Sequence, residues 1–284
     1  MKIGINGASG NLGTATVKHL LERAAGEHSV VAITRSPEKM TMGGVEARFG
    51  DYDQPESLIE AYKGLDRLLL IPSTSLQSGA RSAQNIAAIN AAVEAGVSHI
   101  VLVSSVGARN TEQPNIAFDY FASEQHLMRK APKWSILRMS YYAEALINEA
   151  QMSLAHGVLT GLSENKVSFV SRDDLAAAAA GLLISEGHDG SIYTGTGPVS
   201  FTGAERAELI AKVSGKPLAF FTLPIETLQG QLEQAGLPTA VITAIVSIQQ
   251  NFSNGDFDIV TGDIEKLSGR PARSLESILS ASFQ

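Results

Sequence analysis

The chain has 284 residues, of which 44% are hydrophobic and 18% charged, which is enough to bury a sizeable core in one large domain or two modest ones. The formal net charge is -7 without any basic run, which argues against binding to nucleic acid or to an anionic membrane surface. Because the chain has no cysteine, disulfides, thiolate metal sites and cysteine nucleophiles are excluded, and the six histidines have no ligand spacing, so no metal site is predicted.

The chain begins with a strand, a glycine-rich turn and a helix. Residues 2–6 are a short apolar run, and a pattern with one apolar helix face follows residue 13. The turn between them is Gly7, Ala8, Ser9, Gly10, Asn11, Leu12 and Gly13. The three glycines suit a tight turn, the close approach of a pyrophosphate and close helix packing, and the free N–H groups of the helix start favour a phosphate. In this context the G-x-x-G-x-x-G spacing predicts dinucleotide binding.

Arg35 follows the second predicted strand, residues 30–34. In a dinucleotide-binding fold the residue at this place contacts the adenosine ribose, and a carboxylate there would accept from the 2′-hydroxyl of NAD. This chain has no carboxylate until Glu38, whereas a guanidinium can form two charge-assisted hydrogen bonds to a phosphate. Arg35 therefore predicts NADP(H) as the cofactor; the alternative is an ordinary surface arginine.

Strands and helices alternate through the first half of the chain. Further strands are predicted at 45–49, 68–71, 99–103 and 134–137, with helices between them. This alternation predicts an α/β fold of the Rossmann type, a doubly wound parallel sheet with ligands bound outside the carboxyl ends of its strands. The residues expected at those ends are Gly7, Arg35, Asp51, Pro72, Ser73, Thr74, Ser75, Ser104, Ser105 and Arg138. For Asp51, a contact with adenine and a role in forming the turn are both open.

The second half of the chain differs in character. We expect an NADP-binding domain over residues 1–150 and a substrate-binding lobe over 151–284, with some segments of the lobe returning to the first domain. The lobe is smaller and has no glycine-rich phosphate loop of its own. It is predicted to be mostly helical, with helix starts at Ser171 and Thr202, a strand at 218–222, and helices over 224–235, 238–252 and from 263 onward. We expect the lobe to close the mouth of the ligand cleft at the carboxyl ends of the strands.

The helix after the fifth predicted strand lacks a catalytic pair. A short-chain dehydrogenase uses a tyrosine and a lysine four residues later, because the lysine lowers the pKa of the tyrosine. Here Tyr120 is followed four residues later by Glu124, whose charge we expect to raise the pKa of the tyrosine. If Tyr120 instead stands at the position of the lysine, the position of the tyrosine is occupied by Ile116. Carbonyl–alcohol interconversion and sugar epimerisation are therefore disfavoured.

Aromatic residues remain as candidates for a substrate pocket. Tyr141 and Tyr142 follow Arg138 closely, and Phe118 and Tyr120 lie in the preceding helix. These aromatic residues either line a substrate site or pack in the core. Quinones accept hydride readily, stack on aromatic faces and can be protonated by water, so the protein needs only to hold the acceptor over the nicotinamide.

These residues together resemble the NmrA-like branch of the atypical short-chain dehydrogenases/reductases, and within it the bacterial type 2 NAD(P)H:quinone oxidoreductases and the triphenylmethane reductases. The resemblance covers essentially the whole chain. It is carried by the glycine turn, residues 32–37, 50–52, 63–71, 95–97 and 171–173, Leu137 and Arg138 with Tyr142, and residues 214–216.

The resemblance implies which residues hold the cofactor: residues 7–12, Arg35, Ser73 with Thr74, the stretch from Arg138 to Tyr142, and Arg172. The alternative for Arg172 is a surface residue in the first turn of a helix. Members of this branch also lack the tyrosine–lysine pair. Where similar members carry a histidine, this chain has Tyr120, which leaves substrate preference open.

The leading hypothesis is an NADPH-dependent reductase of quinones or similar small hydride acceptors. The alternatives are a non-catalytic NADP(H) sensor that regulates a partner, and a reductase of dyes or other xenobiotics. We expect a small quinone-like molecule as the partner, no nucleic acid and no membrane, with oligomer formation open. Because the first strand begins at residue 2 and no apolar run is long enough to span a bilayer, we expect a cytoplasmic protein.

Overall fold

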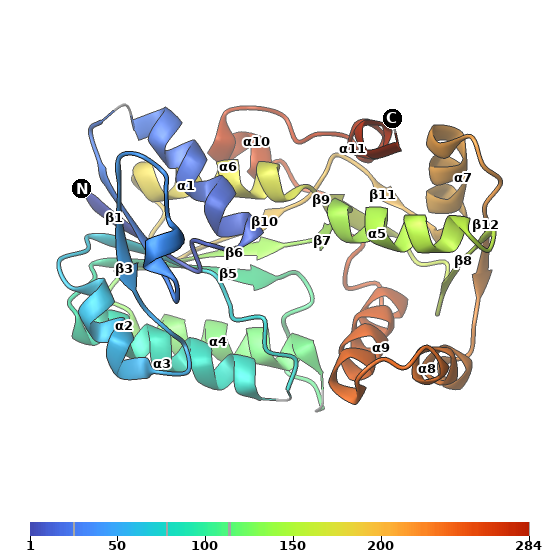
Figure 1. Cartoon of the computed structure of the whole chain (residues 1–284), viewed down its shortest axis with the longest axis horizontal. Helices are drawn as coiled ribbons and strands as arrows, with labels where there is room; N and C mark the ends of the chain where they lie inside the picture. The colour runs from blue at the N-terminus through green and yellow to red at the C-terminus, as the bar shows by residue number, and fades with distance from the viewer. Residues whose placement is uncertain (25, 78, 113–114, 284) are drawn as a thin grey trace.

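The computed structural model describes residues 1–24, 26–77, 79–112 and 115–283. A seven-stranded sheet with the order β10-β6-β5-β4-β1-β2-β3 forms the centre of the left half in Figure 1, and all its neighbouring strands are parallel. Its strands are β1 (Lys2–Asn6), β2 (Ser29–Thr34), β3 (Val45–Phe49), β4 (Arg67–Leu70), β5 (His99–Ser105), β6 (Trp134–Met139) and β10 (Ser191–Gly195). The strand order reverses between β1 and β4, which is where such sheets bind ligands.

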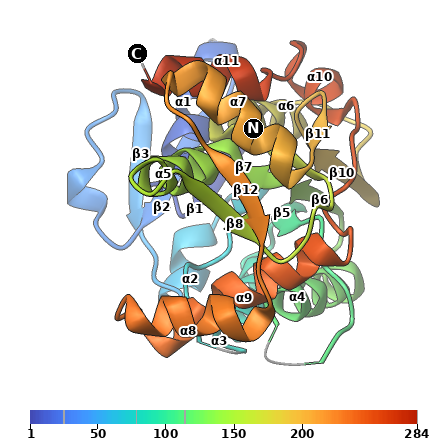
Figure 2. The same cartoon turned by 90° about the vertical axis from the view of Figure 1, so that its right-hand side faces the viewer.

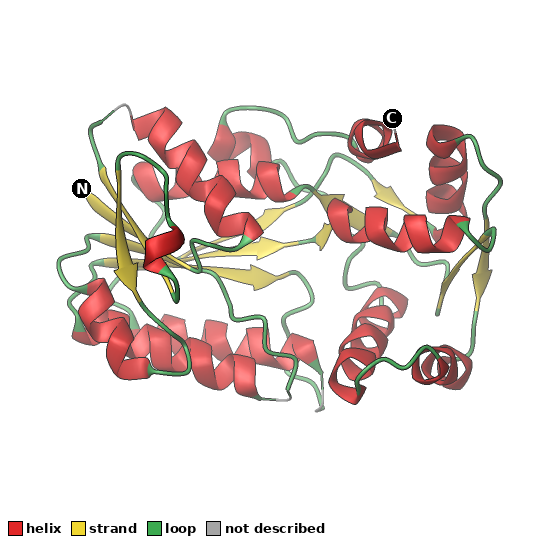
Figure 3. Cartoon of the chain, in the orientation of Figure 1, coloured by secondary structure: helices red, strands yellow, loops and turns green. Residues whose placement is uncertain are grey.

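Helices cover both faces of this sheet (Figures 1 and 3). One face carries α1 (Asn11–Ala24), α6 (Arg172–Ile184) and α10 (Asp263–Ser268), and the other carries α2 (Pro55–Tyr62), α3 (Ala80–Glu94) and α4 (Ile116–Lys130). Consecutive side chains of a strand enter opposite layers: Leu69 packs with α1 and α6, whereas Leu68 and Leu70 pack with α2 and α3. This explains why the strands are apolar throughout, and it confirms the predicted α/β doubly wound fold.

The second half of the chain builds a further layer beside the carboxyl ends of the strands (Figure 2). Its short strands are β7 (Tyr141–Tyr142), β8 (Val158–Gly161), β9 (Val167–Val170), β11 (Ser200–Phe201) and β12 (Ala219–Thr222). They form a three-stranded sheet, β11-β9-β7, and a two-stranded sheet, β12-β8. The helices of this half are α5 (Ala143–Leu154), α7 (Gly203–Ser214), α8 (Ile225–Gln234), α9 (Thr239–Ser253) and α11 (Leu275–Phe283). In the first half, a 3-10 turn, η1, spans Pro37–Lys39.

Two predictions for this half need correction. Of its strands, only the one near 218–222 was predicted; the missed strands include 191–195, which is the edge strand of the main sheet. The helix predicted from residue 263 onward is interrupted, because Gly269 has a φ of 77° that ends α10 before α11 begins. None of the helices in the described parts of the chain is both long and apolar enough to cross a membrane.

Helix α6 is buried along most of its length. Residues 174–183 are all inaccessible, and six of them are alanine or glycine. A Cβ atom at Gly181 would lie 1.9 Å from the carbonyl oxygen of Leu267 in α10. The small side chains of α6 therefore allow α1, α10 and the sheet to approach it closely.

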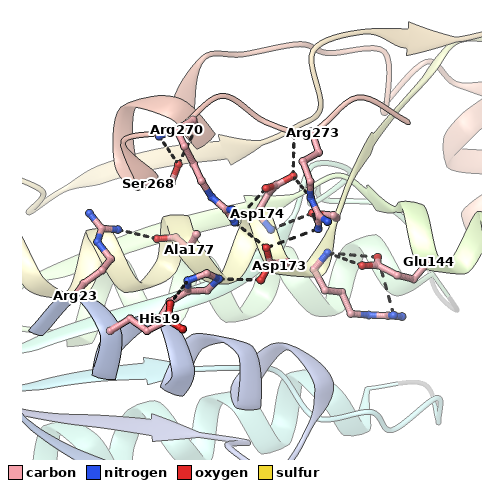
Figure 4. Close-up of polar contacts among 12 residues, drawn as sticks. His19, Arg23, Glu144, Asp173, Asp174, Ala177, Ser268, Arg270 and Arg273 are labelled. Carbon is pink, nitrogen blue, oxygen red and sulfur yellow. Dashed lines mark hydrogen bonds and ion pairs between the residues drawn. The ribbon is translucent and has the colours of Figure 1, made fainter. Parts of the chain in front are cut away.

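A charged network joins α1, α6 and the segment after α10 (Figure 4). The Asp173 carboxylate binds His19 Nε2 at 2.8 Å and Arg270 Nη2 at 2.7 Å. The buried Asp174 carboxylate accepts from the backbone N–H of Arg273 at 3.0 Å. Burial acts to raise the pKa of Asp173, but the hydrogen bonds from Arg270 and His19 hold that pKa below its ordinary value. The C-terminal segment is thereby fixed to the Rossmann layer.

Candidate functional site

The glycine turn is folded tightly against the end of β2. Gly7 has a φ of 83°, and the N–H groups of Gly7 and Ala8 both donate to the carbonyl oxygen of Ile33, at 3.1 and 3.2 Å. A Cβ atom at Gly13 would lie 2.2 Å from the Gly7 carbonyl oxygen. Only glycine at position 13 therefore allows α1 to begin directly over the turn.

The start of α1 presents free hydrogen-bond donors. Across the part of the chain that the structure describes, the amides of Asn11, Leu12 and Gly13 have no acceptor, and the first amide to find one is that of Thr14, 2.8 Å from the Gly10 carbonyl oxygen. No acidic residue lies in the first turn of α1. These donors and the positive end of the helix dipole suit a phosphate group, so this site fits the pyrophosphate of a dinucleotide.

A cavity of about 590 Å³ opens beside this turn, at the carboxyl ends of β1 to β4. This volume is in the range of ordinary small-molecule sites. The predicted cofactor residues that line it are Gly7, Ser9, Gly10, Arg35, Asp51, Ser73 and Thr74. Ala8 and Leu12 are buried in the core beneath the turn and are not among the residues that line the cavity.

The walls of the cavity are held by hydrogen bonds. Thr34 Oγ1 donates to Ser9 Oγ at 2.9 Å, which joins the end of β2 to the glycine turn. The Asp51 carboxylate accepts from the backbone N–H of Asp53 at 3.1 Å, and the Asp51 amide is 3.0 Å from Ser57 Oγ. Asp51 thus has the turn-forming role considered above while also lining the cavity.

Other lining residues were not predicted from the sequence. The Tyr52 hydroxyl donates to the Ile71 carbonyl oxygen at 2.5 Å, and Gln84 Nε2 donates to Asp53 Oδ1 at 2.6 Å. The Ser73 hydroxyl donates to Gln84 Oε1. Gln84 lies in the middle of an amphipathic helix, so no local motif marks it as part of a site; only the packing of α3 beside the 73–75 turn brings it there.

Arg138 lies outside this cavity and already has a partner. Its guanidinium binds the carboxylate of Glu124 through two hydrogen bonds, of 2.8 and 2.6 Å, and Glu124 is fully buried. These bonds raise the pKa of Arg138. The neighbouring predicted residue Ser104, at the end of β5, is fully buried, and its hydroxyl has no partner among the described residues.

Arg172 and Tyr142 lie together at the start of α6. The Arg172 guanidinium is 4.9 Å from the centre of the Tyr142 ring, which is a cation–π distance. The Arg172 backbone N–H donates to Glu144 Oε1 at 3.0 Å. Burial raises the pKa of Tyr142, and so does the nearby Tyr120.

The predicted aromatic residues do not form one wall. Tyr141 packs edge-on against Phe252, with 5.0 Å between ring centres, inside the core of the second half. Phe118 lies on α4 beside Phe121, with 6.4 Å between ring centres. Tyr120 and Tyr142 remain near each other at the carboxyl side of the main sheet.

The pKa of Tyr120 is raised, as expected, but Glu124 is not the reason. Burial is the main cause, Asp119 adds to it, and the Arg81 guanidinium opposes it. Glu124 has no part because its carboxylate is bound to Arg138. The buried Arg81 was missed in the sequence because it lies in a helix with ordinary amphipathic spacing, where an arginine is expected to face solvent.

Known proteins resemble this chain over its full length. Quinone oxidoreductase 2 of Escherichia coli is 30% identical over 99% of this chain and 98% of that protein. NAD(P)H azoreductase of Xenophilus azovorans is 26% identical, covering 97% and 96% of the two chains.

Solved structures also resemble this chain over its full length. The E. coli NADPH-dependent quinone oxidoreductase QOR2 in complex with NADPH has a TM-score of 0.91 at 30% identity, covering 99% of this chain and 100% of the other. The triphenylmethane reductase of Citrobacter sp. has a TM-score of 0.88 at 30% identity, covering 100% and 99%. A family described as NAD(P)H-binding matches residues 7–186 of this chain. The chain, whose glycine turn lies at the head of that match, belongs to this NAD(P)H-binding family.

Proposed function

We propose that the protein is an NADPH-dependent reductase that transfers hydride to a quinone or a similar small acceptor. The observation that carries this proposal is the cavity that is lined both by Gly10, which directly precedes the free amides of α1, and by Arg35. The relatives named above include a quinone oxidoreductase, an azoreductase and a dye reductase, all of which fit an acceptor that takes hydride directly.

The residues of the site have distinct tasks toward NADPH. The amides of Asn11, Leu12 and Gly13 hold the pyrophosphate, and Arg35 binds the 2′-phosphate at the end of β2. Ser73 and Thr74 follow β4 and direct the cofactor across the switch point toward β5 and β6. The bound cofactor supplies the hydride, and the protein supplies orientation and exclusion of water.

The two halves of the chain divide these tasks. Residues 1–150 bind the cofactor, and residues 151–284, apart from the segments that return to the Rossmann domain, form the lobe that bounds the acceptor site. Arg172 of the second half and Tyr142 of the first half are in contact near the nicotinamide end. The Arg138 guanidinium is bound to Glu124. Arg138 therefore stabilises the site through this ion pair instead of binding a phosphate of the cofactor. The protein acts in the cytoplasm, where the NADP(H) pool is kept reduced.

The test is oxidation of NADPH by the purified protein with a panel of benzoquinones and naphthoquinones, repeated with NADH. We expect quinone-dependent oxidation with a preference for NADPH. Absence of turnover with every acceptor, together with equal affinity for NADPH and NADP⁺, would instead identify a non-catalytic sensor. Faster turnover of dyes than of quinones would place the protein among dye reductases on the same scaffold.

A further inference from the structure

Arg81 is a buried arginine to which none of the described residues offers a carboxylate partner. It lies on α3 and is only 6% exposed. Its Nη1 donates to the Tyr120 hydroxyl at 2.9 Å, its Nη2 donates to the Ser75 carbonyl oxygen at 3.2 Å, and its Nε has no acceptor among the described residues. The neighbouring Asp119 carboxylate accepts instead from Ser82 Oγ at 2.8 Å. A buried cation whose contacts are all neutral favours a negative charge beside it.

The hydroxyl of Tyr120 is the group that can carry that negative charge. Its oxygen accepts the hydrogen bond from Arg81, so its own hydrogen is free to be donated. In the described parts of the chain no residue accepts this hydrogen. The Tyr120 ring lies 5.2 Å from the Arg81 guanidinium carbon, which further limits its movement. The phenol is therefore held as a donor.

Tyr120 lies on the side of the sheet toward which the nicotinamide end of a bound cofactor would extend. A cofactor with its adenosine beside β2 crosses the switch point and extends toward β4, β5 and β6. Ser75, which shares the Arg81 guanidinium with Tyr120, lines both the cofactor cavity and a small cavity between the 75–76 turn, the start of α4 and α9. Tyr120 is thus joined through Arg81 to a residue that lines both cavities.

We propose that Tyr120 donates the proton that completes reduction of the acceptor, and that Arg81 is the positioning residue that aims the phenol and stabilises the phenolate left behind. The inference rests on the proposed reductase function. A quinone gains two electrons and one hydrogen as hydride from NADPH, which becomes NADP⁺. The O–H bond of Tyr120 breaks, its proton forms an O–H bond on the other reduced oxygen, and water later returns a proton to the phenolate.

The groups around the phenol act in opposite directions on its proton. Burial raises the pKa of Tyr120 and Asp119 adds to this increase, which makes the proton harder to release. Arg81 acts in the opposite direction, both through its hydrogen bond and through its charge. Removing Arg81 therefore makes the proton harder to release.

The test compares two kinds of acceptor in the variant Tyr120→Phe. A quinone needs a proton as well as a hydride, whereas a triphenylmethane dye cation such as malachite green becomes a neutral product by taking hydride alone. We expect kcat for 1,4-benzoquinone to fall by about 100-fold, the usual effect of losing a general acid. NADPH affinity and reduction of the dye cation should stay at the wild-type level. The slowing of quinone reduction in D₂O should also disappear.

Tyr193→Phe is the matched control. Tyr193 is as buried as Tyr120, and its hydroxyl is 2.7 Å from His188 Nδ1, away from both cavities. This variant should reduce both acceptors as the wild type does. If Tyr120→Phe reduces the quinone as fast as the wild type, the inference fails while the reductase function stands. If the wild-type protein reduces neither acceptor, the function itself fails.

Variants of Arg81 separate positioning from stability. Arg81→Met should lower quinone turnover as much as Tyr120→Phe does. The double variant should lose no more turnover than either single variant, because Arg81 acts through Tyr120 and either change removes the same proton donation. Arg81→Lys keeps a charge and should recover part of the activity. If Arg81→Met weakened NADPH binding and slowed dye and quinone reduction equally, the role of Arg81 would be structural only.

Discussion

The assignment of Arg35 as the group that binds the 2′-phosphate can be tested by Arg35→Ala. Arg35 stands at the carboxyl end of β2 and lines the cofactor cavity, and its side chain is exposed to solvent. Loss of a hydrogen bond to a charged partner costs about 1.5–3 kcal/mol, and solvent screening reduces this for an exposed group. We therefore expect NADPH binding to weaken by about 1–2 kcal/mol, a factor of about 5–30 in Kd.

The assay is a fluorescence titration of the variant with NADPH and with NADH. NADH has no phosphate at this position, so its Kd should stay nearly unchanged, and the difference between the two cofactors should shrink. Lys18→Ala is the control, because Lys18 is an exposed cation on α1 that does not line the cavity. Equal weakening of NADPH and NADH by Arg35→Ala would refute the reasoning, since it would show that Arg35 contacts a part common to both. Raising the salt concentration should narrow the wild-type preference for NADPH.

The remaining predictions concern the supports of the site. Gly13→Ala should weaken NADPH and NADH binding alike and lower the melting temperature, because the added Cβ forces α1 away from the turn. Glu124→Ala should destabilise the protein by about 3–5 kcal/mol in urea unfolding, since it leaves the Arg138 guanidinium without its partner. Glu276→Ala, which removes the partner of the exposed Lys212, should change the unfolding free energy far less. Asp173→Asn should lower the melting temperature at neutral pH. Because the folded pKa of Asp173 is depressed, this difference should shrink as the pH falls below its unfolded pKa of about 4 and be lost once the pH falls through its lower folded pKa. If the difference in melting temperature between the wild type and Asp173→Asn persisted in acid, the stabilising role of the Asp173 carboxylate would be contradicted.

The first half of the fold was predictable because its signals are local. The glycine turn, the apolar strands and the helix periodicity each specify a short element, and the parallel doubly wound arrangement follows from their alternation. Arg35 could be placed at the cofactor cavity for the same reason, since a residue directly after β2 must lie at the edge where ligands bind.

The second half and the interior polar groups were not predictable in this way. Strands such as β7 and β11 have two residues each, too few for a periodic pattern, and their pairing is set by distant partners. Tyr141 and Tyr142 are neighbours in sequence, but alternation along the strand sends Tyr141 into the aromatic core and Tyr142 toward Arg172. Arg81 became buried only because α4 packs over α3, a contact that no spacing in the sequence reveals.

The small side chains of α6 have a consequence for motion. A helix that touches α1, α10 and the sheet on all sides, with backbone contacts as close as those at Gly181, cannot slide or rotate without clashing. Since α6 belongs to the second half of the chain yet is packed within the Rossmann layer, a hinge motion between the two halves would have to break these contacts. The residues at the start of α6 are therefore held against the main sheet by the same packing that buries the rest of the helix.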